Sequence, residues 1–235
     1  MPRAIPHFIA GTRRFGDGSN TAPVFNPATG EQTGLLYLAT AAEVGEAVAA
    51  ATKAFPAWAG TTPLRRARIL NRFLHIMEER IGELAAVITA EHGKTLSDAR
   101  GEIGRGMEVV EFATGAPHLL KGEITENVSN RVDSYSVRQP LGVVAGITPF
   151  NFPAMVPLWM FPVALACGNC FILKPSETRP VRVASSRRLA EGSRPSGWGL
   201  QRGSWRQGCS GRHPEPPRHR GGQLRRIDAD RSLHL

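Results

Sequence analysis

The sequence predicts an α/β fold, in which a helical N-terminal layer leads into the first part of a Rossmann-like parallel sheet. Three observations support this prediction. Residues 40–112 carry apolar side chains at helical spacing. Two short apolar runs, at residues 141–147 and 170–174, have the composition of strands that are buried on both faces. A segment of helical length separates the two runs, and a strand–helix–strand order is typical of parallel strands.

Residues 1–35 are predicted to be extended and rich in turns, because Asn-Pro and Thr-Gly steps at residues 26–30 favour turns. A first helix is expected to follow from Thr40. Thr40 and Glu43 have the spacing of a capping box, in which each side chain binds the backbone of the other residue. We expect Pro56 to end this helix, since proline lacks the N–H group that a helix interior uses.

Three further helices are predicted, over residues 63–80, 81–91 and 97–112. Gly93 is expected to end the second of them, because glycine readily adopts the left-handed conformation that follows many helices. Residues 132–138 alternate between apolar and polar side chains and are predicted to form a strand.

The helix between the two apolar runs is expected over residues 153–166. Ligands of such sheets bind beyond the carboxyl ends of the strands. The functional edge of the sheet is therefore expected directly after Ile147 and after Leu173.

The charge of the chain is divided unevenly between two parts. Residues 1–177 contain 16 basic and 16 acidic side chains, which cancel. Residues 178–235 contain 13 arginines and four acids, and 13 − 4 gives +9, the whole net charge of the chain. The basic excess is therefore no evidence about a partner of residues 1–177.

The last 58 residues, which we call the tail, contain eight Leu, Ile, Val and Phe residues in all. This is too few for a core to offset chain entropy, so the tail is expected to be disordered. Arginine-rich segments bind phosphates without sequence preference, and a nonspecific nucleic-acid-binding module with a basic tail is therefore an alternative function. Specific binding of a nucleic acid is not expected.

Other classes of protein are disfavoured by the composition. No apolar run reaches the roughly 18 residues of a membrane span, and the N-terminus lacks the apolar core of a secretory signal, so a cytoplasmic location is expected. Three cysteines form no disulfide framework, and no metal-binding spacing is present. Cys167 and Cys170 have the C-x-x-C form. Two buried thiols are the preferred interpretation, and a redox pair is the alternative.

Two segments at the expected functional edge carry a resemblance. Ile-Thr-Pro-Phe-Asn-Phe-Pro at residues 147–153 and Phe-Ile-Leu-Lys-Pro-Ser-Glu at residues 171–177 resemble the aldehyde dehydrogenase superfamily. Val-Pro-Leu-Trp-Met-Phe-Pro at residues 156–162 and Glu-Phe-Ala at residues 111–113 are similar to its CoA-acylating branch, the methylmalonate-semialdehyde dehydrogenases. The resemblance covers residues 5–177 without an evident gap.

The resemblance implies NAD-dependent oxidation of methylmalonate or malonate semialdehyde to propionyl- or acetyl-CoA, with coenzyme A as acyl acceptor, by a homo-oligomer. It implies that Asn151 donates its side-chain amide to the oxyanion of the reaction. Arg105 falls where this branch keeps an arginine for the substrate carboxylate, which suits a planar guanidinium. Five residues are expected to bind the cofactor, the last three at the adenosine ribose: Thr148, Phe150, Lys174, Ser176 and Glu177.

Simpler interpretations of the same residues stay open if the resemblance is set aside. Arg105 could be an ordinary solvated residue of a helix. Asn151 could cap the helix that follows it, a position that asparagine favours. Lys174 could be an ordinary end of a strand.

The chemistry of the family needs a cysteine thiolate that attacks the aldehyde, and the resemblance implies that this cysteine lies far downstream of Glu177. Cys167 and Cys170 lie in the wrong element, and Cys209 has only a superficially similar context. The nucleophile is therefore expected to be absent. We expect residues 1–177 to be an inactive N-terminal part, with an incomplete NAD-binding domain and an oligomerisation arm near residues 128–138.

The tail is compatible with a shifted reading frame. One base later, Trp198 before Gly199 forces a glycine codon. Trp205 before Arg206 similarly gives the glycine codon GGC if that arginine uses a CGN codon. Where the code leaves freedom, the shifted frame can also encode Phe-Val-Gly-Ser-Thr, a loop of the family near the nicotinamide. The sequence therefore predicts one extra base directly after the Glu177 codon, with residues 178–235 out of frame.

Overall fold

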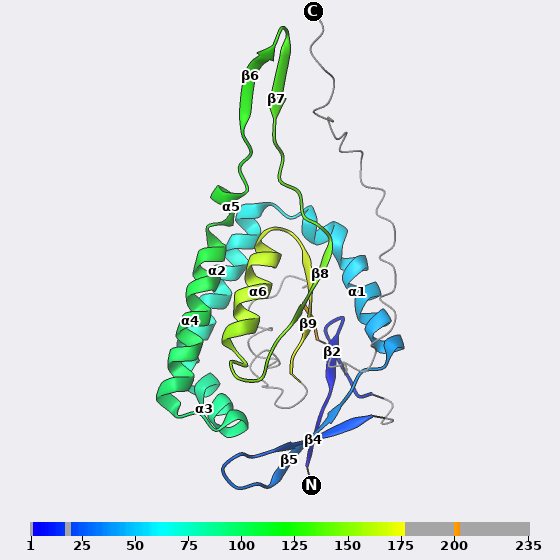
Figure 1. Cartoon of the computed structure of the whole chain (residues 1–235), viewed down its shortest axis with the longest axis vertical. Helices are drawn as coiled ribbons and strands as arrows, with labels where there is room; N and C mark the ends of the chain where they lie inside the picture. Colours follow the sequence, from blue (N-terminus) through cyan, green and yellow to red (C-terminus); the bar gives the residue numbers. More distant parts are fainter. Residues whose placement is uncertain (1, 17–19, 177–199, 203–235) are drawn as a thin grey trace, which may run out of the picture.

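The computed structural model describes residues 2–16, 20–176 and 200–202 and confirms the predicted α/β fold (Figure 1). The helices are α1 (Ala41–Ala59), α2 (Pro63–Glu79), α3 (Ile81–His92), α4 (Leu96–Thr114), α5 (Ala116–Leu119) and α6 (Met155–Ala166). The strands are β1 (Arg3–Ile5), β2 (His7–Ile9), β3 (Thr12–Arg14), β4 (Thr21–Phe25), β5 (Gln32–Tyr37), β6 (Ile124–Ser129), β7 (Val132–Tyr135), β8 (Val143–Ile147), β9 (Cys170–Lys174) and β10 (Leu200–Arg202).

The extended N-terminal region is confirmed, and its strands join two sheets. Strand β5 pairs in parallel with β1 and antiparallel with β4, which gives a sheet of order β1-β5-β4. Strands β2 and β3 form an antiparallel pair that belongs to the larger sheet. Strands β2 and β3 are therefore part of the sheet that holds the expected functional edge.

Helix α1 begins with the predicted capping box. The Thr40 backbone N–H donates to Glu43 Oε2 at 2.8 Å, and the Glu43 N–H donates to Thr40 Oγ1 at 3.3 Å. The prediction that Pro56 ends this helix is wrong, because α1 continues to Ala59. Trp58 is buried in this last turn and its Nε1 donates to the Leu165 carbonyl at 3.1 Å. This tertiary contact offsets the one backbone hydrogen bond that proline removes.

Helices α2, α3 and α4 lie within two residues of their predicted bounds. Gly93 has φ +85° and follows α3, as predicted for a glycine that ends a helix. Thr62 and Thr95 cap α2 and α4, because each side chain accepts from the N–H three residues later.

A buried arginine ties α2 to the C-terminal end of α6. Arg66 Nε donates to the Ala166 carbonyl at 2.9 Å, and Nη1 donates to the carbonyls of Ala59, at 3.4 Å, and Thr61. Burial lowers the pKa of the Arg66 guanidinium, and the neighbouring Cys167 opposes this shift. Three segments of backbone therefore meet at one side chain.

The larger sheet has the strand order β3-β2-β10-β9-β8, and β8, β9 and β10 run parallel. The predicted strand–helix–strand unit is confirmed as β8, α6 and β9. Helices α6 and α1 lie on either side of β8 and β9 in Figure 1. All five residues of β9 are buried, and this strand lies at the centre of the core.

Strand β8 differs from the prediction that it is buried on both faces. It is the edge strand of the sheet in the part of the chain that the structure describes, and Gly146 is the one buried residue among its five. Ile147 is 56% exposed. Among the described strands only β9 pairs with β8, so no strand covers the other side of the apolar run. Its outer side therefore stays open.

Within the tail, the structure describes one short strand that the sequence did not predict. Strand β10 lies between β2 and β9, parallel to β9 and antiparallel to β2. Pairing of this kind uses backbone N–H and C=O groups, so it leaves little trace in the hydrophobic pattern. The remaining tail, and Cys209 with it, lies outside the described residues.

Strands β6 and β7 form a hairpin that projects from the rest of the molecule (Figure 1). All residues of both strands are exposed. The hairpin includes most of the predicted arm at residues 128–138, although β6 itself was not predicted. Its part in oligomer formation stays a prediction.

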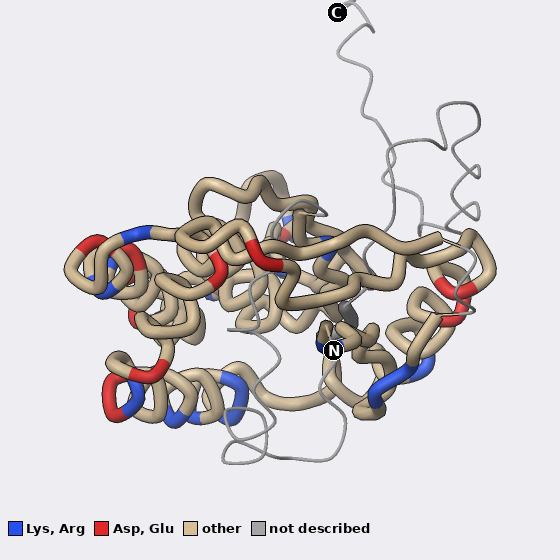
Figure 2. Tube along the Cα trace, turned by 90° about the horizontal axis from the view of Figure 1, so that it is seen from below, with Lys and Arg blue, Asp and Glu red and all other residues tan. Residues whose placement is uncertain are grey.

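Basic and acidic residues are both spread along the described part of the chain (Figure 2). This distribution agrees with the balance of basic and acidic side chains in residues 1–177. None of the helices within residues 2–176 is both long and apolar enough to span a membrane.

Candidate functional site

The carboxyl ends of β8 and β9 meet, as the parallel pairing requires. Ile147 stands opposite Lys174 in the register, and the Thr148 N–H donates to the Lys174 carbonyl at 3.1 Å. Thr148 is buried, and Lys174 is 7% exposed. Two residues expected at the cofactor, 26 positions apart in the sequence (174 − 148), are therefore joined by a backbone hydrogen bond.

The other expected residues lie in the loops that leave these strands. Phe150 and Asn151 are exposed in the segment between β8 and α6, which we call the 148–153 loop. Ser176 is half-buried, two residues beyond the end of β9. Glu177 lies outside the described residues. A threonine, a lysine and a serine at one strand edge provide the hydroxyl and ammonium donors that suit a ribose diol or a phosphate.

The suggestion that Asn151 caps the following helix is not supported. Helix α6 begins after Ala154, and no side chain of its own N-terminal residues caps it. Its first N–H groups instead donate to Glu102 of α4. The Ala154 and Met155 N–H groups lie 2.8 and 3.1 Å from Glu102 Oε1. The Asn151 side chain is thus not required at the helix terminus.

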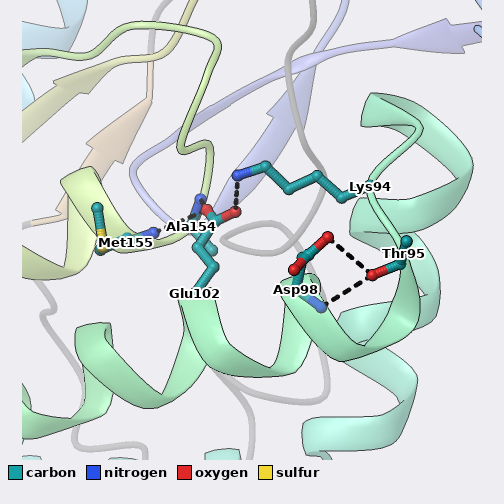
Figure 3. Close-up of polar contacts among 6 residues, drawn as sticks. All are labelled: Lys94, Thr95, Asp98, Glu102, Ala154 and Met155. Atoms are coloured by element: carbon teal, nitrogen blue, oxygen red, sulfur yellow. Dashed lines mark hydrogen bonds and ion pairs between the residues drawn. The ribbon is translucent and has the colours of Figure 1, made fainter.

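Glu102 is a site residue that the sequence analysis missed, and Lys94 is its partner. Lys94 Nζ lies 2.6 Å from Glu102 Oε2, with side-chain exposures of 16% and 1% (Figure 3). The sequence does contain a sign of this role, because Glu102 lies among the buried apolar residues of α4, such as Ala99 and Ile103. A charged residue on the apolar face of a helix indicates a buried partner.

Helices α4 and α6 approach closely because α4 has glycine at the contact. A Cβ atom on Gly106 would lie 2.5 Å from Leu158 Cδ1 and 3.0 Å from Leu158 Cβ. Gly146 of β8 likewise lies against Met160 of α6 and Phe171 of β9. These contacts set the depth at which α6, and the loop before it, sits over the sheet.

We expect Gly106→Ala to destabilise the chain relative to Gly104→Ala. Both glycines lie in α4, but a Cβ on Gly104 would meet nothing within 4 Å. Alanine favours a helix over glycine by about 1 kcal/mol at either site, whereas overpacking at Leu158 costs about 1–3 kcal/mol. Urea unfolding followed by circular dichroism measures the difference between the two variants. Equal free energies of unfolding would show that α6 can move away from α4 without cost.

Arg105 lies beside α6, on the exposed side of α4. Its carbonyl accepts from Trp159 Nε1 at 3.4 Å, and Trp159 is itself 47% exposed. The Arg105 side chain is exposed, so both the solvated residue and the carboxylate ligand remain compatible with its position.

The cysteines of the C-x-x-C segment occupy different elements. Cys167 is the C-cap of α6 and is half-buried, whereas Cys170 begins β9 and is fully buried. Burial raises the pKa of the Cys170 thiol, which lowers its reactivity. Buried thiols are thus confirmed for Cys170 and only partly for Cys167. Among residues 2–16, 20–176 and 200–202, no group of His, Cys, Asp and Glu could hold a metal ion.

Comparison with known sequences finds a family match that includes the whole candidate site. A sequence profile described as the aldehyde dehydrogenase family matches residues 15–196. The match extends past the predicted boundary at residue 177 by 19 residues (196 − 177).

Similar proteins have related activities in their names. The malonate-semialdehyde dehydrogenase of Pseudomonas aeruginosa is 52% identical over 174 residues, covering 74% of this chain and 35% of that protein. The mitochondrial acylating methylmalonate-semialdehyde dehydrogenase of Arabidopsis thaliana is 51% identical, covering 77% and 30% respectively. The chain therefore spans about a third of the length of these curated relatives.

One solved structure is similar to this chain both in fold and in sequence. It comes from Sinorhizobium meliloti 1021 and is described as a methylmalonate-semialdehyde dehydrogenase complexed with NAD. It has a TM-score of 0.84 and 47% identity to this chain, and the match covers 88% of this chain and 42% of that one.

Proposed function

The chain belongs to the aldehyde dehydrogenase family, and from this premise we propose that it carries the N-terminal part of a CoA-acylating semialdehyde dehydrogenase. The proposed reaction oxidises methylmalonate or malonate semialdehyde with NAD and coenzyme A to propionyl- or acetyl-CoA, and the substrate carboxylate leaves as carbon dioxide. The observation that supports this most is the meeting of Thr148 and Lys174 at the carboxyl edge of β8 and β9, with Asn151 in the adjoining loop.

The residues at this edge fit part of an NAD site. NAD supplies the hydride acceptor of the reaction when it is bound. The Lys174 ammonium and the Ser176 hydroxyl are donors that suit the adenosine ribose, and Glu177 would add the carboxylate acceptor. Thr148 and Phe150 would lie along the cofactor, where an exposed phenylalanine ring can cover an apolar surface.

Asn151 and Arg105 would act on the semialdehyde. The Asn151 amide would donate to the carbonyl oxygen, which becomes an oxyanion when a thiolate adds to the carbon. Arg105 would bind the carboxylate at the far end of the substrate through its planar guanidinium. The thiolate itself is not supplied by Cys167 or Cys170, since Cys167 caps α6 and Cys170 lies at the amino end of β9, away from the carboxyl ends of the strands.

We therefore expect the 235-residue polypeptide by itself to be inactive. Residues 1–177 form the incomplete N-terminal part, and residues 178–235 are proposed to be translated out of frame. The β6–β7 hairpin would serve as the arm through which complete subunits form a homo-oligomer. Deleting one base after the Glu177 codon would give a longer product, which we call the frame-restored protein.

The test compares both proteins for NADH formation from each semialdehyde, with and without coenzyme A. The 235-residue polypeptide is expected to form no NADH, and the frame-restored protein is expected to form NADH and acyl-CoA together. NADH formation by the 235-residue polypeptide would contradict the proposed inactivity. A folded frame-restored protein without activity would contradict the proposed reaction. Resequencing the DNA around the Glu177 codon tests the frame itself.

A further inference from the structure

Glu102 is the most deeply buried carboxylate side chain among the described ion pairs, at 1% exposure. Both of its oxygens are used. Oε1 accepts from the Ala154 and Met155 N–H groups, and Oε2 accepts from Lys94 Nζ at 2.6 Å (Figure 3). A buried carboxylate is stable only when its oxygens are bound in this way, because desolvation of an unpaired charge is costly.

The Glu102 carboxylate replaces the cap that α6 lacks. The first N–H groups of a helix have no partner within the helix, and its N-terminus carries a partial positive charge. Ala154 at the N-cap provides no acceptor side chain. A carboxylate from another helix satisfies two of these N–H groups and thereby fixes where α6 begins, directly after the 148–153 loop.

Lys94 holds the same loop from a second point. Its ammonium lies 4.0 Å from the centroid of the Phe152 ring, in addition to its ion pair with Glu102. Phe152 directly follows Asn151 in the sequence. The contact of a cation with a ring face favours one position of the ring, and the backbone of the neighbouring residue is constrained with it. Lys94 is itself placed by Gly93, whose left-handed conformation ends α3.

We propose that Lys94 and Glu102 are positioning residues that hold the 148–153 loop in the conformation in which Asn151 serves as oxyanion donor. This inference rests on the proposed function for the role of Asn151. In this proposal the pair needs no contact of its own with substrate or cofactor. The pair acts on Asn151 in two ways. Glu102 fixes the N-terminus of α6, which follows the loop, and Lys94 holds the ring of Phe152, the residue after Asn151.

The variants Glu102→Gln and Lys94→Met test the proposal, with Glu108→Gln as control. Gln at position 102 can still accept from the two backbone N–H groups but no longer forms the ion pair. Methionine at position 94 keeps the length of the side chain without its charge. Glu108 is an exposed residue of the same helix, six positions from Glu102 (108 − 102), so its substitution is expected to leave the loop unchanged.

The first readout is spectroscopic and uses the 235-residue chain. Both variants are expected to shift the Asn151 side-chain amide resonances and the Ala154 and Met155 amide resonances, and to speed hydrogen exchange of these two amides. Glu108→Gln is expected to leave them in place. Unchanged Asn151 resonances in both variants would overturn the proposal, even if the variants were less stable.

The second readout uses the frame-restored protein. Misplacement of a reacting group by about 1 Å can lower a rate by up to about 100-fold, so we expect kcat to fall about 10- to 100-fold in each variant. The KM for NAD should change less than about threefold, and the double variant should resemble the single ones, because both residues act through one contact. Multiplied effects in the double variant, or equal changes in KM and kcat, would overturn the proposal.

The two proposals can fail separately. A frame-restored wild-type protein without semialdehyde oxidation would contradict the proposed function. The spectroscopic readout on the 235-residue chain would still decide whether Lys94 and Glu102 position the loop.

Discussion

In the frame-restored protein, Asn151→Ala is expected to lower kcat by about 100- to 1,000-fold, the usual cost of removing one donor from an oxyanion site. Asn151 is exposed in the 148–153 loop and is not used as a helix cap, since Glu102 fills that position. Its loss should therefore leave folding largely intact. Steady-state kinetics with a fixed semialdehyde and varied NAD separate the fall in kcat from any change in KM.

A second substitution at the same position distinguishes a donor from a spacer. Asn151→Asp keeps the size of the side chain but replaces the donating amide with an anionic acceptor. Activity should fall at least as far as in Asn151→Ala, because an anion repels the developing oxyanion. Substantial activity in the aspartate variant would show that position 151 contributes shape only.

The largest expected loss of stability follows Arg66→Met. Methionine resembles the unbranched aliphatic part of the arginine side chain but has no hydrogen-bond donor. The carbonyls of Ala166, Ala59 and Thr61 therefore lose their shared partner. Each buried polar group left without a partner costs about 1–3 kcal/mol, and we expect a total loss of roughly 3 kcal/mol or more. Urea unfolding of the 235-residue polypeptide measures this loss.

Arg68→Met is the matched control for that experiment. Arg68 belongs to the same helix but is exposed, and a surface substitution of this kind usually changes stability by less than about 0.5 kcal/mol. If the two variants unfolded at the same urea concentration, the three carbonyls would have found other partners. The junction of α1, α2 and α6 would then be held by apolar packing alone.

Much of the fold could be predicted because local chemistry decides it. The capping box at Thr40 and the left-handed glycine at position 93 depend on residues close in sequence, and both were predicted correctly. The errors came from contacts distant in sequence. Pro56 stays inside α1 where Trp58 reaches the Leu165 carbonyl, 107 residues away. The sequence near Pro56 does not predict that contact.

The candidate site shows the same division. Thr148 and Lys174 could be placed together because parallel strands end at a common edge, and the structure joins them by a backbone hydrogen bond. The residues that hold the 148–153 loop could not be predicted in this way. Glu102 reaches α6 across 52 residues, and its partner Lys94 comes from the segment before α4. A buried charge could be suspected from the helix pattern, but its partners follow only from the packing of α4 on α6.

The open side of β8 has a consequence for synthesis of the protein. A chain leaves the ribosome from its N-terminus, and domains fold in that order. Every strand described in residues 2–176 belongs to a sheet, and none of them pairs with the outer side of β8. A strand that completed this side would therefore emerge later or come from another molecule. Until that strand arrives, the unpaired backbone groups of β8 can pair with a neighbouring nascent chain. The time between the synthesis of β8 and the arrival of its second partner strand is therefore a time in which misassembly can occur.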